Sequence, residues 1–86
     1  MTESRIRRRD IFSTFERVQD CFTDTQWEVV TRYYRDGKSE QQIADELGLS
    51  RSAVNERRHR AEERKRLREA ELREEQFRLL RKYQNP

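Results

Sequence analysis

The sequence contains very few of the residues that form covalent or metal cross-links. Its 86 residues include one cysteine, Cys21, and one histidine, His59. A single cysteine excludes a disulfide within the chain and a zinc site of the cysteine type. Because there is also no Gly-rich phosphate loop and no carboxylate–histidine cluster, the sequence predicts neither an enzyme nor a bound metal or cofactor.

Apolar residues are also scarce and never gather in a long run. They make up 31% of the chain against 43% charged residues, and no run approaches the roughly 20 residues that span a bilayer. The basic N-terminal residues are not followed by the apolar segment of a secretory leader. We therefore expect a cytoplasmic protein that does not contact a membrane and whose small core needs a partner for stability.

Charge is abundant, and it is unevenly placed. Residues 1–50 carry 8 Lys or Arg against 10 Asp or Glu, whereas residues 51–86 carry 12 against 7. Within residues 51–68, 8 basic residues stand against 3 acidic ones. Such a segment is typical of a surface that binds phosphates, although a solvated Arg-rich helix has the same composition.

The first half of the chain has helical periodicity. The apolar spacing predicts a helix over residues 5–22, with one face formed by Ile11, Phe15, Val18 and Phe22. The basic residues from Arg5 to Arg9 form either an arm along a duplex or a solubilising terminus. A second helix is expected to begin at Thr23, because Thr23 and Gln26 have the spacing of a capping box. It is expected to end at Gly37, since glycine adopts the left-handed conformation without strain. Its apolar face consists of Trp27, Val30, Tyr33 and Tyr34.

Two further helices joined by a tight turn are predicted next. Ser39 and Gln42 repeat the capping-box spacing, Gly48 ends this short helix, and Ser50 caps the next. The side chains expected to pack around the turn are Ile43, Ala44, Leu47, Leu49 and Val54. Ala44 must be small because the following helix passes closest there. This is the pattern of a helix-turn-helix, in which the second helix enters the major groove.

The last helix is expected to be long. No glycine or proline follows Ser50 until Pro86, and strong helix formers dominate. The sequence therefore predicts one unbroken helix from Arg51 to about Tyr83, which extends the reading helix far beyond the turn.

Residues 22–61 resemble region 4 of bacterial sigma factors and the regulators built on that domain. The matching positions are Phe22-Thr23, Gln26, Glu28-Val29-Val30, Gly37, Ser39, Ile43-Ala44, Leu47-Gly48-Leu49-Ser50, Val54 and His59-Arg60-Ala61. The resemblance implies a four-helix domain whose last helix reads a promoter element, with Arg51, Ser52 and Asn55 at base- or phosphate-contacting positions. The family has an apolar residue where this chain has Arg57 or Arg58, so the packing behind the helix is expected to be thinner.

On a helix that begins at Arg51, one face points outward, away from Val54 and Ala61. The predicted base-reading residues on that face are Arg51, Ser52, Asn55, Glu56 and His59. Arginine pairs with guanine and asparagine with adenine, which makes Arg51 and Asn55 the leading candidates. Glu56 either accepts from cytosine or pairs with Arg60. The residues predicted to contact phosphate are Arg57, Arg58, Arg60, Lys38, Ser39, Thr23 and Gln26.

The end of the chain carries a separate apolar patch. It consists of Leu72, Phe77, Leu79, Leu80 and Tyr83. An exposed patch of this kind needs a cover, which is either the first helix folding back or the same patch on a second copy. We expect a homodimer, because two-fold DNA sites require two reading heads.

The sequence thus predicts an all-α protein in three parts. Residues 1–22 form a basic arm and first helix, residues 23–61 the helix-turn-helix core, and residues 62–86 a charged helix for self-association. The expected function is sequence-specific binding of double-stranded DNA by a dimeric bacterial or phage transcriptional regulator. Two alternatives remain open: a module that binds RNA polymerase or another regulator, and an oligomeric accessory in phage DNA packaging or recombination.

Overall fold

The computed structural model describes residues 7–84, so Arg5 of the predicted arm lies outside the described residues. The elements are α1 (Arg8–Glu16), the 3-10 turn η1 (Gln19–Cys21), α2 (Asp24–Val30), the π-helical turn η2 (Thr31–Arg35), α3 (Glu40–Leu47) and α4 (Arg51–Gln84). No strand occurs between residues 7 and 84, and the predicted all-α class with its long last helix is confirmed.

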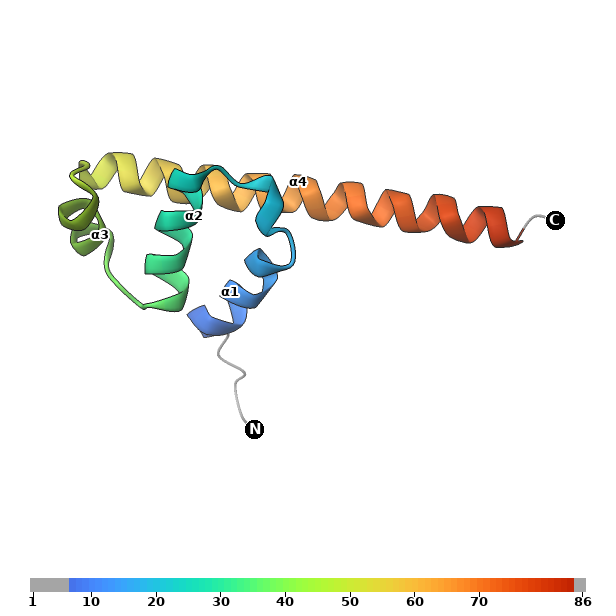
Figure 1. Cartoon of the computed structure of the whole chain (residues 1–86), viewed down its shortest axis with the longest axis horizontal. Coiled ribbons are helices and arrows are strands. Elements are labelled where there is room, and N and C mark those ends of the chain that lie inside the picture. The colour runs from blue at the N-terminus through green and yellow to red at the C-terminus, as the bar shows by residue number, and fades with distance from the viewer. Residues whose placement is uncertain (1–6, 85–86) are drawn as a thin grey trace, which may run out of the picture.

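Helix α4 organises the molecule. Helices α1, α2 and α3 pack beside its first half, and its second half projects beyond them (Figure 1). Its 34 residues span about 50 Å at about 1.5 Å per residue. Within the described residues, no helix is long and apolar enough to cross a membrane.

The first predicted helix is shorter than expected. The sequence predicted a helix over residues 5–22, but α1 ends at Glu16 and the chain turns into η1. The hydroxyls of Ser13 and Thr14 donate to backbone carbonyls three residues earlier, at 2.7 and 2.6 Å, a pattern that weakens a helix near its end. The turn also brings Phe22 against Phe15, with ring centroids 5.6 Å apart. Tertiary packing therefore overrides the local helical spacing.

The core divides into two clusters. The first contains Phe12, Phe15, Val30, Tyr34 and Ala61, and joins α1, α2 and η2 to the first half of α4. The second contains Val29, Ile43, Ala44 and Val54, with Leu47 and Leu49 packed at its edge. Tyr33 packs against both clusters. Because α4 contributes Ala61 to one cluster and Val54 to the other, it is anchored at two points two helical turns apart.

The second helix ends in a wider turn that the sequence did not predict. The amide of Asp36 donates to the carbonyl of Thr31, five residues back, at 3.0 Å. Gly37 then has φ 71°, as the predicted stop requires. The guanidinium of Arg8 donates to the carbonyls of Tyr33 and Lys38 at 3.2 and 3.1 Å. An α1 side chain thereby satisfies backbone groups left open beyond the end of the second helix.

The turn between α3 and α4 has the predicted geometry. Gly48 has φ 66°, and the amide of Leu49 donates to the carbonyl of Ala44 at 2.9 Å, which is the bond of a Schellman motif. The hydroxyl of Ser50 accepts from the amide of Ala53 at 3.1 Å. The predicted capping boxes at Thr23–Gln26 and Ser39–Gln42 are confirmed. The chain therefore reverses sharply at Gly48, which sets the direction of the α4 N-terminus.

Candidate nucleic-acid interface

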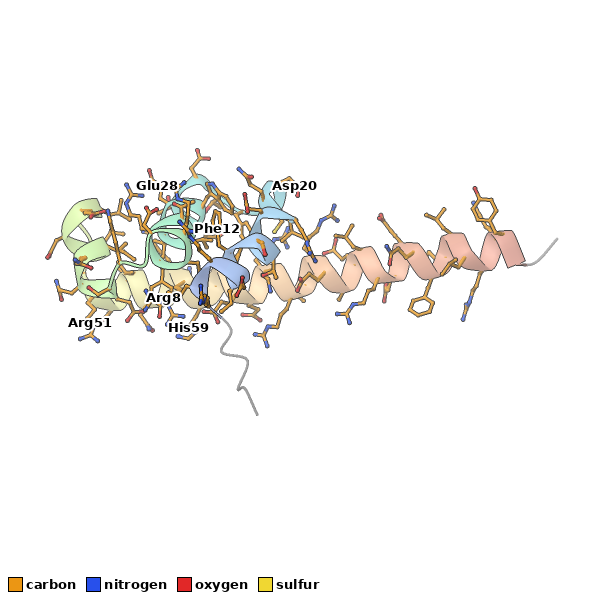
Figure 2. The ribbon with its side chains drawn as sticks, turned by 90° about the horizontal axis from the view of Figure 1, so that it is seen from below. Arg8, Phe12, Asp20, Glu28, Arg51 and His59 are labelled. Atoms are coloured by element: carbon orange, nitrogen blue, oxygen red, sulfur yellow. The ribbon has the colours of Figure 1, made fainter. Side chains whose placement is uncertain are left out.

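The N-terminal turns of α4 have two contrasting sides. Val54 and Ala61 are fully buried, whereas Arg51, Ser52, Glu56 and His59 are exposed. Figure 2 shows Arg51 and His59 along the edge formed by α4, on the side of the molecule away from Glu28. Four of the five predicted base-reading residues thus lie together on one accessible surface.

The fifth, Asn55, is half-buried and already has a partner. Its Nδ2 donates to Glu40 Oε2, at the start of α3, at 2.8 Å. Arg51 lies beside them, with its Nε 4.0 Å from Glu40 Oε1. Glu40, Arg51, Ser52 and Asn55 line one shallow pocket. Sequence reasoning missed Glu40, because residues 40 and 55 become neighbours only when α3 folds against α4.

A second shallow pocket lies between the start of α2 and the outer side of α4. It is lined by Thr23, Gln26, Ala53, Glu56, Arg57 and Arg60. It therefore gathers four of the residues predicted to contact phosphate. Glu56 forms an ion pair with Arg60, which is one of the two roles predicted for this acid. The Thr23 hydroxyl accepts from the Gln26 amide, so its acceptor role is taken by the helix cap.

The structure does not support the phosphate contact predicted for Arg58. Its side chain is 16% exposed and its Nε lies 3.2 Å from Glu40 Oε2. Its Nη1 lies 2.6 Å from Glu62 Oε1, and its guanidinium carbon sits 4.5 Å from the ring centre of Tyr33. Arg58 thus takes an inward position on α4, one helical turn after the buried Val54. Arginine can do so because its stem packs against apolar atoms and its planar head stacks on an aromatic ring.

Two other predicted phosphate contacts also have partners within the fold. Lys38 Nζ lies 2.6 Å from Glu46 Oε2, and Arg32 Nε lies 3.1 Å from Glu46 Oε1. The Ser39 hydroxyl accepts from the Gln42 amide at 3.2 Å. These groups stabilise the start of α3 and its junction with η2. Arg57, which is half-buried, and Arg60, which is exposed and pairs with Glu56, border the pocket at the start of α2 and are the better placed of the predicted phosphate contacts.

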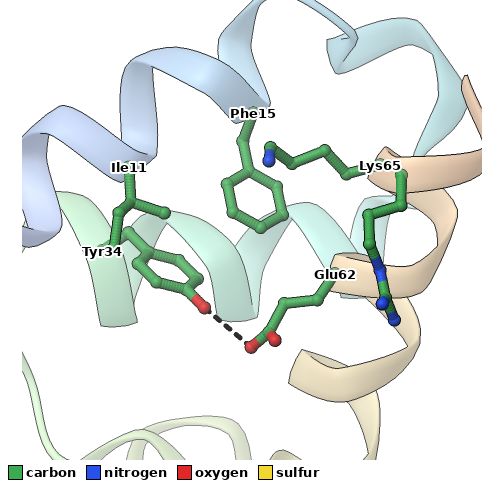
Figure 3. Close-up of a pocket in the computed structure, with 6 residues that line it drawn as sticks. Ile11, Phe15, Tyr34, Glu62 and Lys65 are labelled. Carbon is green, nitrogen blue, oxygen red and sulfur yellow. Dashed lines mark hydrogen bonds between the residues drawn. The ribbon is translucent and has the colours of Figure 1, made fainter. Parts of the chain in front are cut away.

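A polar contact crosses the core-facing side of α4, well away from Arg51. The hydroxyl of Tyr34 donates to Glu62 Oε1 at 2.8 Å, in a pocket also lined by Ile11, Phe15 and Lys65 (Figure 3). Burial, together with this bond to a carboxylate, raises the pKa of Tyr34 to about 12. This site ties η2 to α4. No group of three or more His, Cys, Asp or Glu that could hold a metal ion occurs in the part of the chain described.

The distal half of α4 is only partly as predicted. Phe77, Leu79, Leu80 and Tyr83 are exposed, Tyr83 at 87%, and they do not fold back on α1. Leu72 differs from the prediction: it is half-buried and lines a pocket with Arg17 and Val18 at the end of α1. The exposed patch therefore begins after Leu72. Leu67, 53% exposed, was not predicted as a surface residue.

Comparison with known proteins agrees with this geometry. The family described as sigma-70, region 4, matches residues 23–64. No curated protein and no solved structure matches the chain. A domain of this family indicates a role in DNA binding connected with transcription. The match begins at the cap of α2 and ends in α4 just beyond Ala61, so it covers both helices of the turn and the surface described above. Residues 23–64, which hold the helix-turn-helix, therefore form a domain similar to the sigma-70 region 4 family.

Proposed function

We propose that this protein is a sequence-specific double-stranded DNA-binding regulator of transcription that acts by binding and not by catalysis. One observation carries the proposal: the turn at Gly48 directs the N-terminal turns of α4 outward. Val54 is fully buried on one side of those turns, while Arg51 and Ser52 are exposed on the other. A helix held in this way can enter the major groove with its N-terminal residues at the base edges.

The charges around the reading surface support the same function. Arg57 and Arg60 border the pocket at the start of α2, where a duplex backbone would pass when Arg51 meets the bases. Phosphate contacts of this kind position a protein, while base contacts specify the sequence. We therefore assign base reading to Arg51 and phosphate contact to Arg57.

Two arginine variants test this assignment. A preferred duplex is first selected from random sequence. Arg51→Ala should then lose affinity for that duplex and keep its affinity for a scrambled one. Arg57→Ala should weaken binding to both and reduce the slope of log K against log salt by about 1. Arg81→Ala, at the exposed far end of α4, is the matched control and should change neither. Equal losses on both duplexes for Arg51→Ala would contradict its role.

We also propose that the protein acts as a homodimer joined through Phe77, Leu79, Leu80 and Tyr83. These exposed side chains lie beyond the part of α4 covered by the fold, and covering them would remove large apolar side chains from water. Sedimentation at micromolar concentration should give twice the chain mass of 10.7 kDa. A single-chain mass that persists at high concentration would refute the dimer. Ring-shaped oligomers would favour the DNA-packaging alternative, and tight polymerase binding without duplex preference would favour the interaction module.

A further inference from the structure

Glu40 is an acid placed next to the surface that the proposed function assigns to base reading. It is the first residue of α3, yet its side chain is only 16% exposed because it reaches across to α4. Its carboxylate accepts from Asn55 Nδ2 at 2.8 Å and from Arg58 Nε at 3.2 Å. Arg51 Nε lies 4.0 Å from its other oxygen. One carboxylate therefore contacts both leading base-reading candidates.

This carboxylate is held in place from behind. Arg58 is fixed by Glu62 and by the ring of Tyr33, so the guanidinium that binds Glu40 has little freedom. Partial burial alone would raise the pKa of Glu40. The bonds from Asn55 and Arg58, with the nearby arginine charges, outweigh burial and hold the pKa below its ordinary value. Glu40 is therefore ionised at neutral pH and can only accept hydrogen bonds.

An acceptor-only neighbour decides which way the Asn55 amide faces. The two ends of an asparagine amide are a donor and an acceptor of nearly equal size, and the partners determine their orientation. Beside an ionised carboxylate, the nitrogen must face Glu40, because the amide oxygen has nothing to accept from it. This leaves the amide oxygen and the second amide hydrogen for another partner.

We propose that Glu40 is a positioning residue for sequence reading: it fixes the Asn55 amide so that one donor and one acceptor remain for an adenine edge. Adenine offers the matching pair in the major groove, N7 as acceptor and the N6 amino group as donor. The idea rests on the proposed function, since it requires α4 to lie in the groove. In this proposal Glu40, a residue of α3, influences which base is read by orienting Asn55. Glu40 itself does not contact the base.

The test compares variants at single base pairs of the selected site. Asn55→Ala first identifies the base pair at which Asn55 discriminates. At that pair, Glu40→Gln should reduce the preference for adenine about ten-fold, because a glutamine amide can bond either end of Asn55. Preferences at base pairs read by neither Asn55 nor Arg51 should stay unchanged, which a merely structural role for Glu40 would not produce. In the Asn55→Ala background, Glu40→Gln should have no further effect on that preference.

Asp45→Asn is the matched control. It removes the same charge from α3, and among the residues described its carboxylate accepts a hydrogen bond from Gln41 of the same helix alone. It should leave every base preference unchanged. If Glu40→Gln keeps the full adenine preference at the Asn55 base pair, or if that pair shows no adenine preference in the wild-type chain, the inference is wrong. A wild-type chain without any sequence preference would instead refute the proposed function itself.

A measurement on the wild-type chain covers the case in which Glu40→Gln does not fold. The side-chain amide protons of Asn55 can be followed by NMR in the free chain and in the complex with the selected duplex. One proton should stay bonded to Glu40 in both states while the other shifts on DNA binding. Loss of the Glu40 bond in the complex would overturn the proposal.

Discussion

At the scale of single residues, Arg58 connects the stability of the fold to its reading surface. Its guanidinium stacks on Tyr33 and bonds Glu40 and Glu62. Arg8 lies over the same ring, with its guanidinium carbon 4.0 Å from the ring centre. An arginine-rich sequence with few apolar residues thus uses the aromatic face of Tyr33 to hold a half-buried arginine, Arg58, and an exposed one, Arg8.

The first prediction follows from this placement. Arg58→Ala should lower the free energy of unfolding by about 1–3 kcal/mol, because Glu40 and Glu62 each lose a charged partner in a partly buried setting. It should leave the salt dependence of DNA binding unchanged in a chain that stays folded. Denaturant unfolding and duplex titration at two salt concentrations measure the two effects. If Arg58→Ala instead kept the wild-type stability and reduced the slope of log K against log salt by about 1, Arg58 would contact phosphate as the sequence predicted.

Tyr34 gives a prediction for alkaline pH. Its folded pKa of about 12 lies above the ordinary value of 10.0, so the folded state disfavours the charged phenolate. The contribution of Tyr34 to stability is therefore complete below pH 10 and is lost as pH rises from there towards 12. Tyr34→Phe should be less stable at pH 8 by about 1 kcal/mol, the value of one hydrogen bond. Its stability should also fall less steeply above pH 10. Parallel unfolding curves for the two proteins across this range would contradict the assignment.

At the scale of elements, the sequence predicts features that depend on near neighbours. The caps at Thr23 and Ser39 and the stop at Gly48 follow from residues at most five positions apart, and all are present. The first helix was predicted too long because its end depends on Phe22 packing against Phe15, a contact that local spacing does not contain. The residue types at the five positions of η2 do not indicate a π-helical turn, so the sequence did not predict it.

In the candidate site, too, the features set by near neighbours were predictable and those set by distant residues were not. The outward face of α4 was predictable because Arg51 and His59 lie opposite buried Val54 on a regular helix. The partners of Asn55 and Arg58 were not, since their contact with Glu40 spans 15 and 18 residues of sequence. Hydrogen bonds between distant segments arise only when the folded helices meet. Residue spacing therefore predicts where the reading surface lies, but it does not predict the hydrogen bonds that fix the side chains of that surface.

The turn at Gly48 provides the element-scale prediction. A Cβ at this position would meet nothing within 4 Å, so the effect of a substitution comes from the backbone alone. Gly48→Ala should destabilise the fold by about 1–2 kcal/mol, because φ 66° is strained for an L side chain. Gly48→Asn should lose less, since asparagine tolerates this region. Denaturant unfolding ranks the three proteins, and equal losses for both variants would indicate a steric cause instead.

At the scale of the whole molecule, α4 is both a core element and a projecting rod. Its first half is anchored by Val54 and Ala61, and Lys65 extends over Phe15 with its Nζ 5.3 Å from the ring centre. Further along the same helical face come Leu72, Gln76, Leu79 and Tyr83, at the spacings of four and three residues that keep side chains in one row. The row passes from the core onto the surface, so a second copy would extend a packing face that already exists.

The order of charges beside this row favours an antiparallel pair in the proposed homodimer. Glu75 and Lys82 flank the row on the same side, seven residues apart. In a parallel pair in register, this side of one helix faces the opposite side of the other, so Glu75 and Lys82 do not meet. An antiparallel pair with Gln76 opposite Leu79 of the partner subunit places Glu75 near Lys82 of the partner subunit, twice by symmetry. Opposite charges then face each other at both ends of the contact.

Charge exchange tests this arrangement. Glu75→Lys should weaken dimerisation about ten-fold, because it replaces two attractions with two repulsions of modest size. Glu75→Lys combined with Lys82→Glu should restore the wild-type association, since the pairs are re-formed with their signs reversed. Glu74→Lys, on the opposite side of α4 from the row, is the matched control and should leave the association constant near its wild-type value. In a parallel dimer, Glu75→Lys alone would change the association constant little, and the double variant would associate no better than the wild-type chain. Sedimentation of the four chains therefore separates the two geometries.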